Sequence, residues 1–250
     1  MLYGGHVRSK DDIDFLQRAG FDFGEVVIRS AKARDYWRRS ETRNRALPEF
    51  LLIAHGPFEG PPNDIDNLWN KYHPALRDTI DVARTMEIRF LTIHLWIDPR
   101  FVKAEVIKEK KRALSDLFHY GRDNGVLISI ENLSETADDF ASVLESIPDL
   151  GITLDVGHGQ LLTQTNTSFG IMDKLMGSIK HLHFHDNRGG QGVKDDLHLP
   201  IGDGIVDFKG ILKTLLQKGS SHTLTLELEN KDLIESRAKV KALIDDIVTS

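Results

Sequence analysis

Eight short apolar runs, each separated from the next by a longer polar or amphipathic stretch, constrain this 250-residue chain more than any other feature. Runs of this length that are rich in Val, Ile, Leu and Phe are typical of buried strands, and the stretches between them are long enough for helices. Strands that alternate with helices pair in parallel, because each helix carries the chain back to the start of the next strand. The predicted strands are Leu2–His6, Gly24–Ile28, Phe50–His55, Phe90–Leu95, Val126–Glu131, Gly151–Asp155, Ile179–His185 and Thr223–Leu228.

The stretches between the runs carry helix signals. Ser9 followed by Asp12 resembles a helix N-cap with an acidic third residue, and Gly20 lies where that helix should stop. Residues 103–124 form a long charged stretch, and residues 207–218 carry apolar residues at helical spacing.

Eight strand–helix units predict the α/β class and a closed (β/α)8 TIM barrel. The alternative is an open doubly wound sheet, but no glycine-rich dinucleotide-binding motif follows an early strand. No linker divides the chain, so we expect one domain over residues 1–250.

Composition narrows the chemistry. The chain has no cysteine, which excludes thiol catalysis, iron–sulfur clusters and cysteine-ligated zinc, but it has eleven histidines. The net charge of −6 weakens a nucleic-acid role without excluding one, since a local basic patch suffices for binding. No apolar stretch is long enough to cross a membrane, and the N-terminus lacks the features of a signal peptide. We therefore expect a cytoplasmic protein that has no membrane partner.

Polar residues follow nearly every predicted strand. A single His or Asp in such a place is usually a turn former or a satisfied polar group. In a barrel, however, all these ends meet at one mouth, and so many carboxylates and imidazoles are costly to desolvate unless cations compensate them. Nitrogen and oxygen donors together suit Zn, Mn, Fe or Co without selecting one. The strand-end segments concerned contain His55, His94, Glu131, Asp155, His158, His181, His183, His185, Asp186, Asp196, His198, Asp203, Glu227 and Glu229.

Three of these segments carry a family resemblance. They read Asp155-Val-Gly-His158, His183-Phe-His-Asp-Asn187 and Asp196-Leu-His-Leu-Pro-Ile-Gly-Asp-Gly204. In them the chain resembles the xylose isomerase-like TIM barrel superfamily, which contains sugar phosphate isomerases and epimerases and also the endonuclease IV group (AP endonuclease family 2).

The resemblance implies a ligand set. The isomerase-like members imply metal ligands at Glu131, Asp155, His183 and Glu227. Endonuclease IV-like members imply five more, at His55, His94, His158, Asp196 and His198. The implied cofactor is one to three divalent ions (Zn, Mn, Co or Mg).

Two differences from the endonuclease IV motifs bear on which branch of the superfamily this chain resembles. Endonuclease IV-like proteins carry Glu-Asn-Thr-Ala-Gly and Asp-Thr-Cys-His, where this chain has Glu131-Asn-Leu-Ser-Glu135 and Asp155-Val-Gly-His158. The motifs therefore favour a carbohydrate enzyme, whereas the number of ligands favours phosphoester chemistry.

The leading hypothesis is a divalent-metal-dependent isomerase or epimerase of a sugar or sugar phosphate. It would act through a metal-chelated enediolate, with Glu131 and Glu227 as the paired catalytic acid and base. A hydride shift between adjacent carbons is the competing route. The predicted substrate-binding residues are His185, Asp186, Trp96, Phe58 and Arg34.

The alternative is an endonuclease IV-like multi-zinc phosphodiesterase that acts on abasic-site DNA. Residues 29–45 favour it, because they carry an excess of five positive charges with Tyr36 and Trp37 interleaved. The same segment also fits a solvated helix face with local ion pairs. A third class is a noncatalytic metal-dependent binding protein on the same scaffold. The outer helices of a barrel permit a homo-oligomer.

Overall fold

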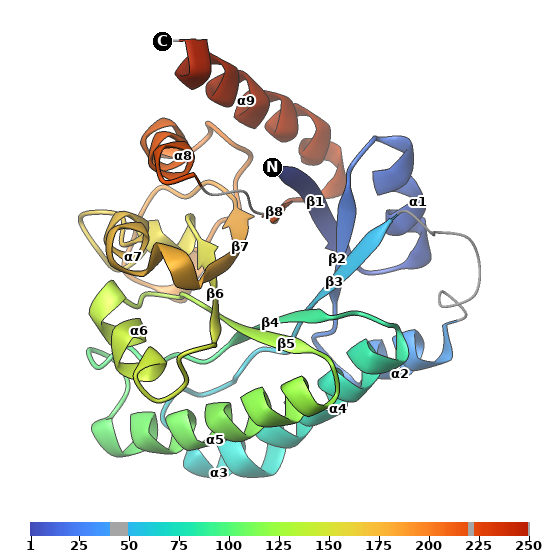
Figure 1. Ribbon diagram of the computed structural model, residues 1–250, viewed down its shortest axis with the longest axis vertical. Helices are drawn as coiled ribbons and strands as arrows, with labels where there is room; N and C mark the ends of the chain where they lie inside the picture. The colour runs from blue at the N-terminus through green and yellow to red at the C-terminus, as the bar shows by residue number, and fades with distance from the viewer. Residues whose placement is uncertain (41–49, 220–222, 250) are drawn as a thin grey trace.

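The computed structural model describes residues 1–40, 50–219 and 223–249. Within these ranges, eight parallel strands form a closed barrel in sequence order, with β1 paired to both β2 and β8 (Figure 1). The predicted TIM barrel is therefore confirmed, with strand ends shifted by one or two residues. The strands are β1 (Leu2–Val7), β2 (Phe23–Val27), β3 (Leu51–His55), β4 (Phe90–His94), β5 (Leu127–Glu131), β6 (Gly151–Asp155), β7 (Ile179–Phe184) and β8 (Thr223–Leu226).

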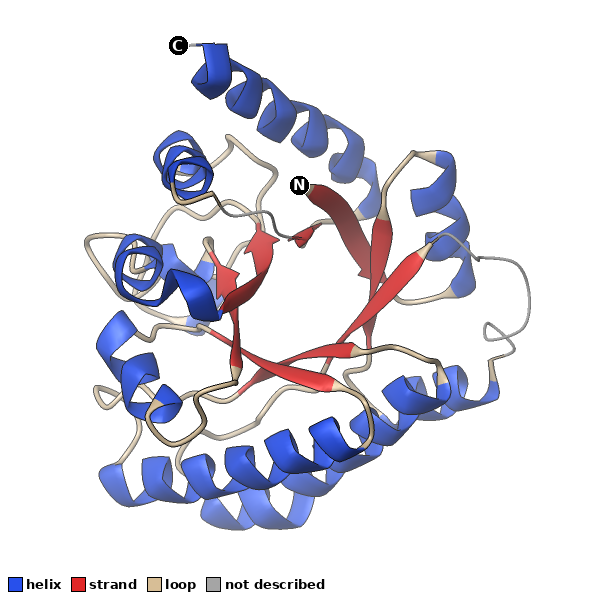
Figure 2. Cartoon of the chain, viewed as in Figure 1, coloured by secondary structure: helices blue, strands red, loops and turns tan. Residues whose placement is uncertain are grey.

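Helices surround the barrel on the outside (Figure 2). The helix predicted over residues 103–124 is α5, and that over 207–218 is α8. No helix in the described ranges has both the length and the apolar character needed to cross a bilayer. The helices are α1 (Lys10–Arg18), α2 (Ala31–Arg39), α3 (Ile65–Asn67), α4 (His73–Thr85), α5 (Ala104–Asp123), α6 (Ala137–Leu144), α7 (Ser168–Leu175), α8 (Phe208–Gln217) and α9 (Asn230–Thr249).

The start of α1 follows the predicted cap. The backbone N–H of Ser9 donates to the Asp12 carboxylate at 2.9 Å, and Gly20, at φ +70°, follows the helix end. A left-handed residue at that point suits glycine, which has no Cβ to clash.

The two faces of the strands differ in chemistry. Outward residues are apolar and pack under the helices; Phe184 of β7, for example, lies 5.4 Å from Phe208 of α8, measured between ring centroids. Inward residues are largely polar: Thr92 of β4 contacts Thr153 of β6 across the lumen at 3.0 Å, although these strands are not neighbours. Thr153 in turn donates to Ser129 of β5 at 2.8 Å. Buried hydroxyls satisfy one another here, so the lumen is a hydrogen-bonded floor beneath the mouth.

Candidate metal centre

The carboxyl ends of four strands bring acidic side chains and histidines together at one mouth of the barrel. Glu131 and Asp155 end β5 and β6, His183 lies one residue before the end of β7, and Glu227 directly follows β8; all four are buried. Asp155 has a ligand atom within 4.8 Å of Glu131 and of Glu227. Ligand atoms of His55, Glu131, His183 and Glu227 likewise all lie within 4.8 Å of one another. The structure therefore brings three of the isomerase-type ligands together with His55, and the fourth, Asp155, adjoins them through Glu131 and Glu227.

The Glu131 carboxylate joins this cluster to a second one. Its Oε2 lies 3.1 Å from Nε2 of His55 and 3.0 Å from Nε2 of His94. Its Oε1 instead faces Nδ1 of His183 at 3.2 Å. One carboxylate with its two oxygens turned to two sets of histidines is suited to bridging two ions.

A third cluster lies beside the first two. Nε2 of His158 and Nε2 of His198 both face Oδ2 of Asp196, at 3.3 Å and 3.2 Å. His198 holds a left-handed backbone with φ +45°, which is costly for a residue with a side chain and is typical of functional sites. All nine residues expected as ligands thus lie in three adjoining clusters.

The histidines are oriented as metal ligands are. His55 donates its Nδ1–H to the carbonyl of Gly56 at 3.0 Å, and His158 and His198 donate theirs to the carbonyls of Asn132 and Glu227, each at 3.1 Å. In each case the other ring nitrogen, Nε2, faces a carboxylate of the cluster. Such an outer hydrogen bond fixes the tautomer of a ligating histidine.

Two buried atoms at the centre of the first cluster have no hydrogen-bond partner in the described residues. They are Oε1 of Glu131 and Nδ1 of His183. The two atoms lie 3.2 Å apart as an ion pair without a hydrogen bond, and a carboxylate oxygen and an imidazole nitrogen are both ligand atoms for a divalent ion. The donor set therefore fits a metal.

Two residues of this site were not predicted from sequence. Glu25 of β2 is buried in the lumen, and both its oxygens lie 3.1 Å from Nε2 of His183, which leaves Nδ1 of that ring directed at the cluster. His6 of β1 donates through Nε2 to Oε1 of Glu227 at 2.8 Å. The available signal was a charged residue inside an apolar strand run for Glu25, and a polar residue at the end of the predicted strand Leu2–His6 for His6.

The charges of the cluster support one another. Burial alone would raise the pKa of Glu131, but His183 and His94 outweigh it and hold that pKa well below its usual range. Burial likewise opposes a charged His183, but Glu25, Glu227 and Glu131 hold the pKa of its imidazole well above its usual range. Protons on the histidines thus balance the carboxylates, and a bound cation would displace them.

The third cluster shows the same balance. Burial disfavours a charged His198, but the hydrogen bond to Asp196 and the charge of Glu227 raise the pKa of His198 to about 9. Burial also disfavours a charged Asp196, yet His158 and His198 hold the pKa of that carboxyl below its usual range.

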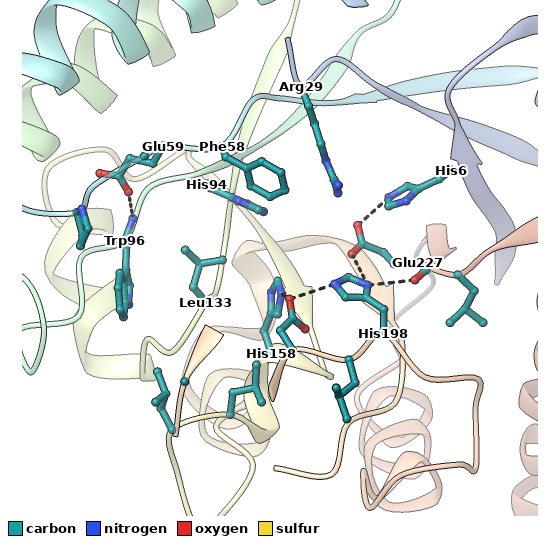
Figure 3. Close-up of a pocket in the computed structure, with 18 of the residues that line it drawn as sticks. His6, Arg29, Phe58, Glu59, His94, Trp96, Leu133, His158, His198 and Glu227 are labelled. Atoms are coloured by element: carbon teal, nitrogen blue, oxygen red, sulfur yellow. Dashed lines mark hydrogen bonds and ion pairs between the residues drawn. The ribbon is translucent and has the colours of Figure 1, made fainter. Parts of the chain in front are cut away.

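A cavity of about 610 Å³ opens above the clusters (Figure 3). Phe58 and Trp96, both predicted to bind substrate, line it together with Leu133 and Leu197. Trp96 is held in place by a 2.7 Å hydrogen bond from Nε1–H to Oγ of Ser134. The cavity therefore combines a polar floor with apolar and aromatic walls, as small-molecule sites do.

Three other predicted substrate residues lie differently. His185 is buried, and its Nε2 lies 3.0 Å from the Asp155 carboxylate. The Asp186 carboxylate accepts the backbone N–H groups of Gly202 and Gly204, both at 2.9 Å, so it holds the loop that follows His198. Arg34 of α2 donates to Asp78 of α4 at 2.7 Å and is not among the described residues that line the cavity.

Basic side chains in the described part of segment 29–45 have different surroundings. Arg38, like Arg34, pairs with Asp78 of α4. Arg29 does line the cavity. Glu41, Arg43 and Arg45 lie outside the described residues.

The family follows from comparison with known proteins. The model of xylose isomerase-like TIM barrel proteins matches residues 13–246. The chain belongs to this family. The uncharacterized protein MJ1311 of Methanocaldococcus jannaschii is 24% identical over 79% of this chain and 71% of its own length. A probable endonuclease 4 of Thermotoga maritima is 24% identical over 58% of this chain, and the match spans only 56% of that relative.

Two solved structures share the whole fold of this chain. A D-tagatose 3-epimerase-like protein matches with a TM-score of 0.81 and 24% identity, over 100% of this chain and 99% of its own. The IolI protein with a bound zinc atom matches with a TM-score of 0.76 and 15% identity, over 99% of each chain. At these identities the likeness shows the fold alone.

Proposed function

We propose that this protein is a divalent-metal-dependent isomerase or epimerase that acts on a small carbohydrate. One observation carries the proposal: two buried glutamates, Glu131 at the end of β5 and Glu227 after β8, face a shared metal-ligand cluster beneath a cavity of about 610 Å³ that Glu227 lines. Such a cavity has room for a small sugar, and its aromatic walls offer faces for sugar C–H groups. The structural likeness to the D-tagatose 3-epimerase-like protein is consistent with this reaction class.

The ligands of the catalytic ion would be Glu131, Asp155, His183 and Glu227. When bound, the ion would polarise a substrate carbonyl and a neighbouring hydroxyl and so acidify the adjacent C–H group. The pKa of Glu131 and of Glu227 is held well below the usual range, since neighbouring histidines outweigh the effect of burial, so both are present as carboxylates. As a carboxylate, one glutamate takes the proton from carbon and becomes the neutral acid. The other first takes up a proton from water and returns it to the opposite side or to the neighbouring carbon, and the proton on the first glutamate then passes back to water.

Different residues hold the two glutamates in position for proton transfer. Oε2 of Glu131 is fixed by His55 and His94, which leaves Oε1 directed into the cluster. Glu227 is anchored through Oε1 by His6, and its Oε2 lies 3.5 Å from Nδ1 of His198. Fixed carboxylates lose little orientational freedom in the reaction, which favours proton transfer.

Substitution of the glutamates tests this proposal. Metal-loaded protein is incubated with a panel of aldoses, ketoses and their phosphates, and the products are separated by chromatography. Glu131→Ala and Glu227→Ala should each lower kcat on the responsive sugar at least about 100-fold, with unchanged circular dichroism. Glu145→Gln, an exposed residue after α6, is the matched control. A fully active Glu227→Ala protein contradicts the assignment.

A second candidate function is hydrolysis of a phosphodiester, including abasic-site DNA. The specific observation in its favour is the His158–Asp196–His198 cluster next to the bridging Glu131, which gives ligands for three ions. Metal analysis of protein purified without chelator separates the two candidates. One ion per chain with activation by Mn or Co supports the isomerase, and three tightly held zinc ions with cleavage of abasic DNA support the hydrolase.

A further inference from the structure

One arginine at the mouth lacks a partner among the described residues. Arg29 follows β2 and lines the cavity, and its Nε is buried without a hydrogen-bond partner. Its guanidinium carbon lies 4.5 Å from the centroid of the Phe58 ring, which supports the side chain from one side. Figure 3 shows Arg29 pointing into the cavity between Phe58 and His6. The side chain is therefore held in place with its charge toward the substrate space.

The carboxylates around the mouth are already engaged elsewhere. Glu59 pairs with the buried Lys110, and Glu229 pairs with Arg8 at 3.3 Å. Glu227, on the floor, accepts the hydrogen bond from His6. No ion pair within the described ranges compensates Arg29, in contrast to Arg34, which is paired with Asp78. A partly desolvated guanidinium of this kind is stabilised when an anion forms a hydrogen-bonded ion pair with it.

We propose that Arg29 forms an anion subsite that binds a phosphate or carboxylate group of the substrate. A guanidinium presents a planar fork of donors that matches either oxyanion. This inference rests on the proposed function and narrows it: the carbohydrate is acidic, with its carbonyl end at the metal cluster and its anionic group at Arg29. The apolar walls between the two would contact the carbon chain.

Equilibrium binding to metal-loaded protein tests the subsite apart from catalysis. The probes are D-fructose 6-phosphate, D-glucuronate and neutral D-fructose, titrated calorimetrically at low ionic strength. The variants are Arg29→Met, which keeps an apolar stem against Phe58, and Arg29→Lys, which keeps the charge without the fork. Arg34→Met removes the same charge outside the cavity and serves as the matched control. Melting temperatures establish that each variant is folded.

The expected result is that Arg29→Met weakens binding of at least one anionic probe about 10-fold or more, while D-fructose binding changes less than about 2-fold. Arg29→Lys should lose less affinity for the anionic probe than Arg29→Met does. Arg34→Met should bind all three probes as the wild type does. The anionic probe that binds more tightly identifies the group as phosphate or carboxylate.

Equal binding of all three probes, or an anionic preference that survives in Arg29→Met, overturns the subsite. The proposed function is judged separately by turnover. Isomerisation of a neutral sugar without any anionic preference would support the proposed function and contradict the subsite. Arg29-dependent binding without isomerase or epimerase turnover of any sugar in the panel would support the subsite and contradict the proposed function.

Discussion

At the residue scale, Glu25 sets how His183 meets the metal cluster. The Glu25 carboxylate contacts Nε2 of the His183 ring from inside the barrel. The other ring nitrogen, Nδ1, therefore faces Glu131 and Glu227, and it has no hydrogen-bond partner in the described structure. A carboxylate behind a ligating histidine fixes the ring and makes it a stronger donor. Glu25 is thus a positioning residue, with no direct part in the proposed proton transfer.

Glu25→Gln should lower the affinity for Zn²⁺ or Co²⁺ about 10- to 100-fold, because the amide cannot supply the negative charge behind His183. Competition with a chromophoric chelator measures the affinity, and the visible absorption of the Co²⁺-loaded protein reports the ligand geometry. Thr92→Ser, elsewhere in the lumen, is the control. Wild-type affinity together with an unchanged Co²⁺ spectrum in Glu25→Gln would show that Glu25 does not position the ligand.

The residues that sequence could predict differ from those it could not by their place in the strand. Glu131, Asp155 and His183 stand at or next to the end of an apolar run, and parallel strands in a barrel bring such ends together. Glu25 lies in the middle of β2, so its role depends on which face of the strand turns inward and on the register that places it beside His6 of β1. That register is a property of the closed barrel.

The sequence also could not predict which arginine of the basic segment reaches the cavity. The basic segment 29–45 indicated a cluster of charge but not its direction. In the fold, α2 turns Arg34 toward Asp78 of α4, whereas Arg29 precedes that helix and reaches the cavity. Only tertiary packing separates these two side chains, which are five positions apart.

At the element scale, buried charges tie together the loops that frame the cavity. Lys110 of α5 donates to the carbonyl of Trp96 at 2.6 Å and pairs with Glu59, which in turn accepts the backbone N–H of Trp96 at 2.8 Å. Glu135 accepts the N–H groups of Ile97 and Leu133, at 2.8 Å and 2.7 Å. The loops after β3, β4 and β5 are therefore held as one unit.

Lys110→Met should destabilise the protein by about 3–5 kcal/mol, because it leaves Glu59 buried without its cation. Urea unfolding followed by circular dichroism measures the loss. The double variant Glu59→Gln with Lys110→Met should recover part of it, since no unpaired charge remains. A single variant as stable as the wild type would mean that the pair does not hold these loops.

Glu135 gives stability a pH dependence. Burial raises the pKa of Glu135 to about 6, although four backbone N–H groups, its own among them, favour its ionised form. In the unfolded chain this pKa is about 4.3, so the folded state binds the proton more tightly, and its stability falls as the pH rises from about 4 to 6. The contribution is about 2 kcal/mol, fully present below the unfolded pKa and lost above the folded one.

Comparison of the wild type with Glu135→Gln isolates this effect from other titrating groups. The difference in free energy of unfolding should shift by about 2 kcal/mol between pH 4 and pH 7 in favour of the variant. Urea titrations at several pH values provide the measurement. A difference that is constant across this range contradicts a raised pKa for Glu135.

At the scale of the whole molecule, the net charge of −6 belongs to the metal-free chain. Four of the acidic residues that contribute to it are proposed ligands: Glu131, Asp155, Asp196 and Glu227. Bound ions would offset that charge, so the acidity of the sequence does not oppose an anionic substrate at the mouth. Closure of the barrel was predictable from eight alternating units, whereas the polar lumen required the side chains to be seen in place.

The central claim is metal-dependent proton transfer at carbon, and solvent exchange tests it most directly. Metal-loaded protein is incubated in D₂O with the sugar that it converts, and proton NMR follows the C–H group next to the carbonyl. We predict deuterium incorporation at that carbon, lost in Glu227→Gln and on removal of the metal. Conversion without deuterium uptake would mean a hydride shift. Absence of both conversion and exchange across the sugar panel, with cleavage of abasic DNA by the same preparation, would contradict the account.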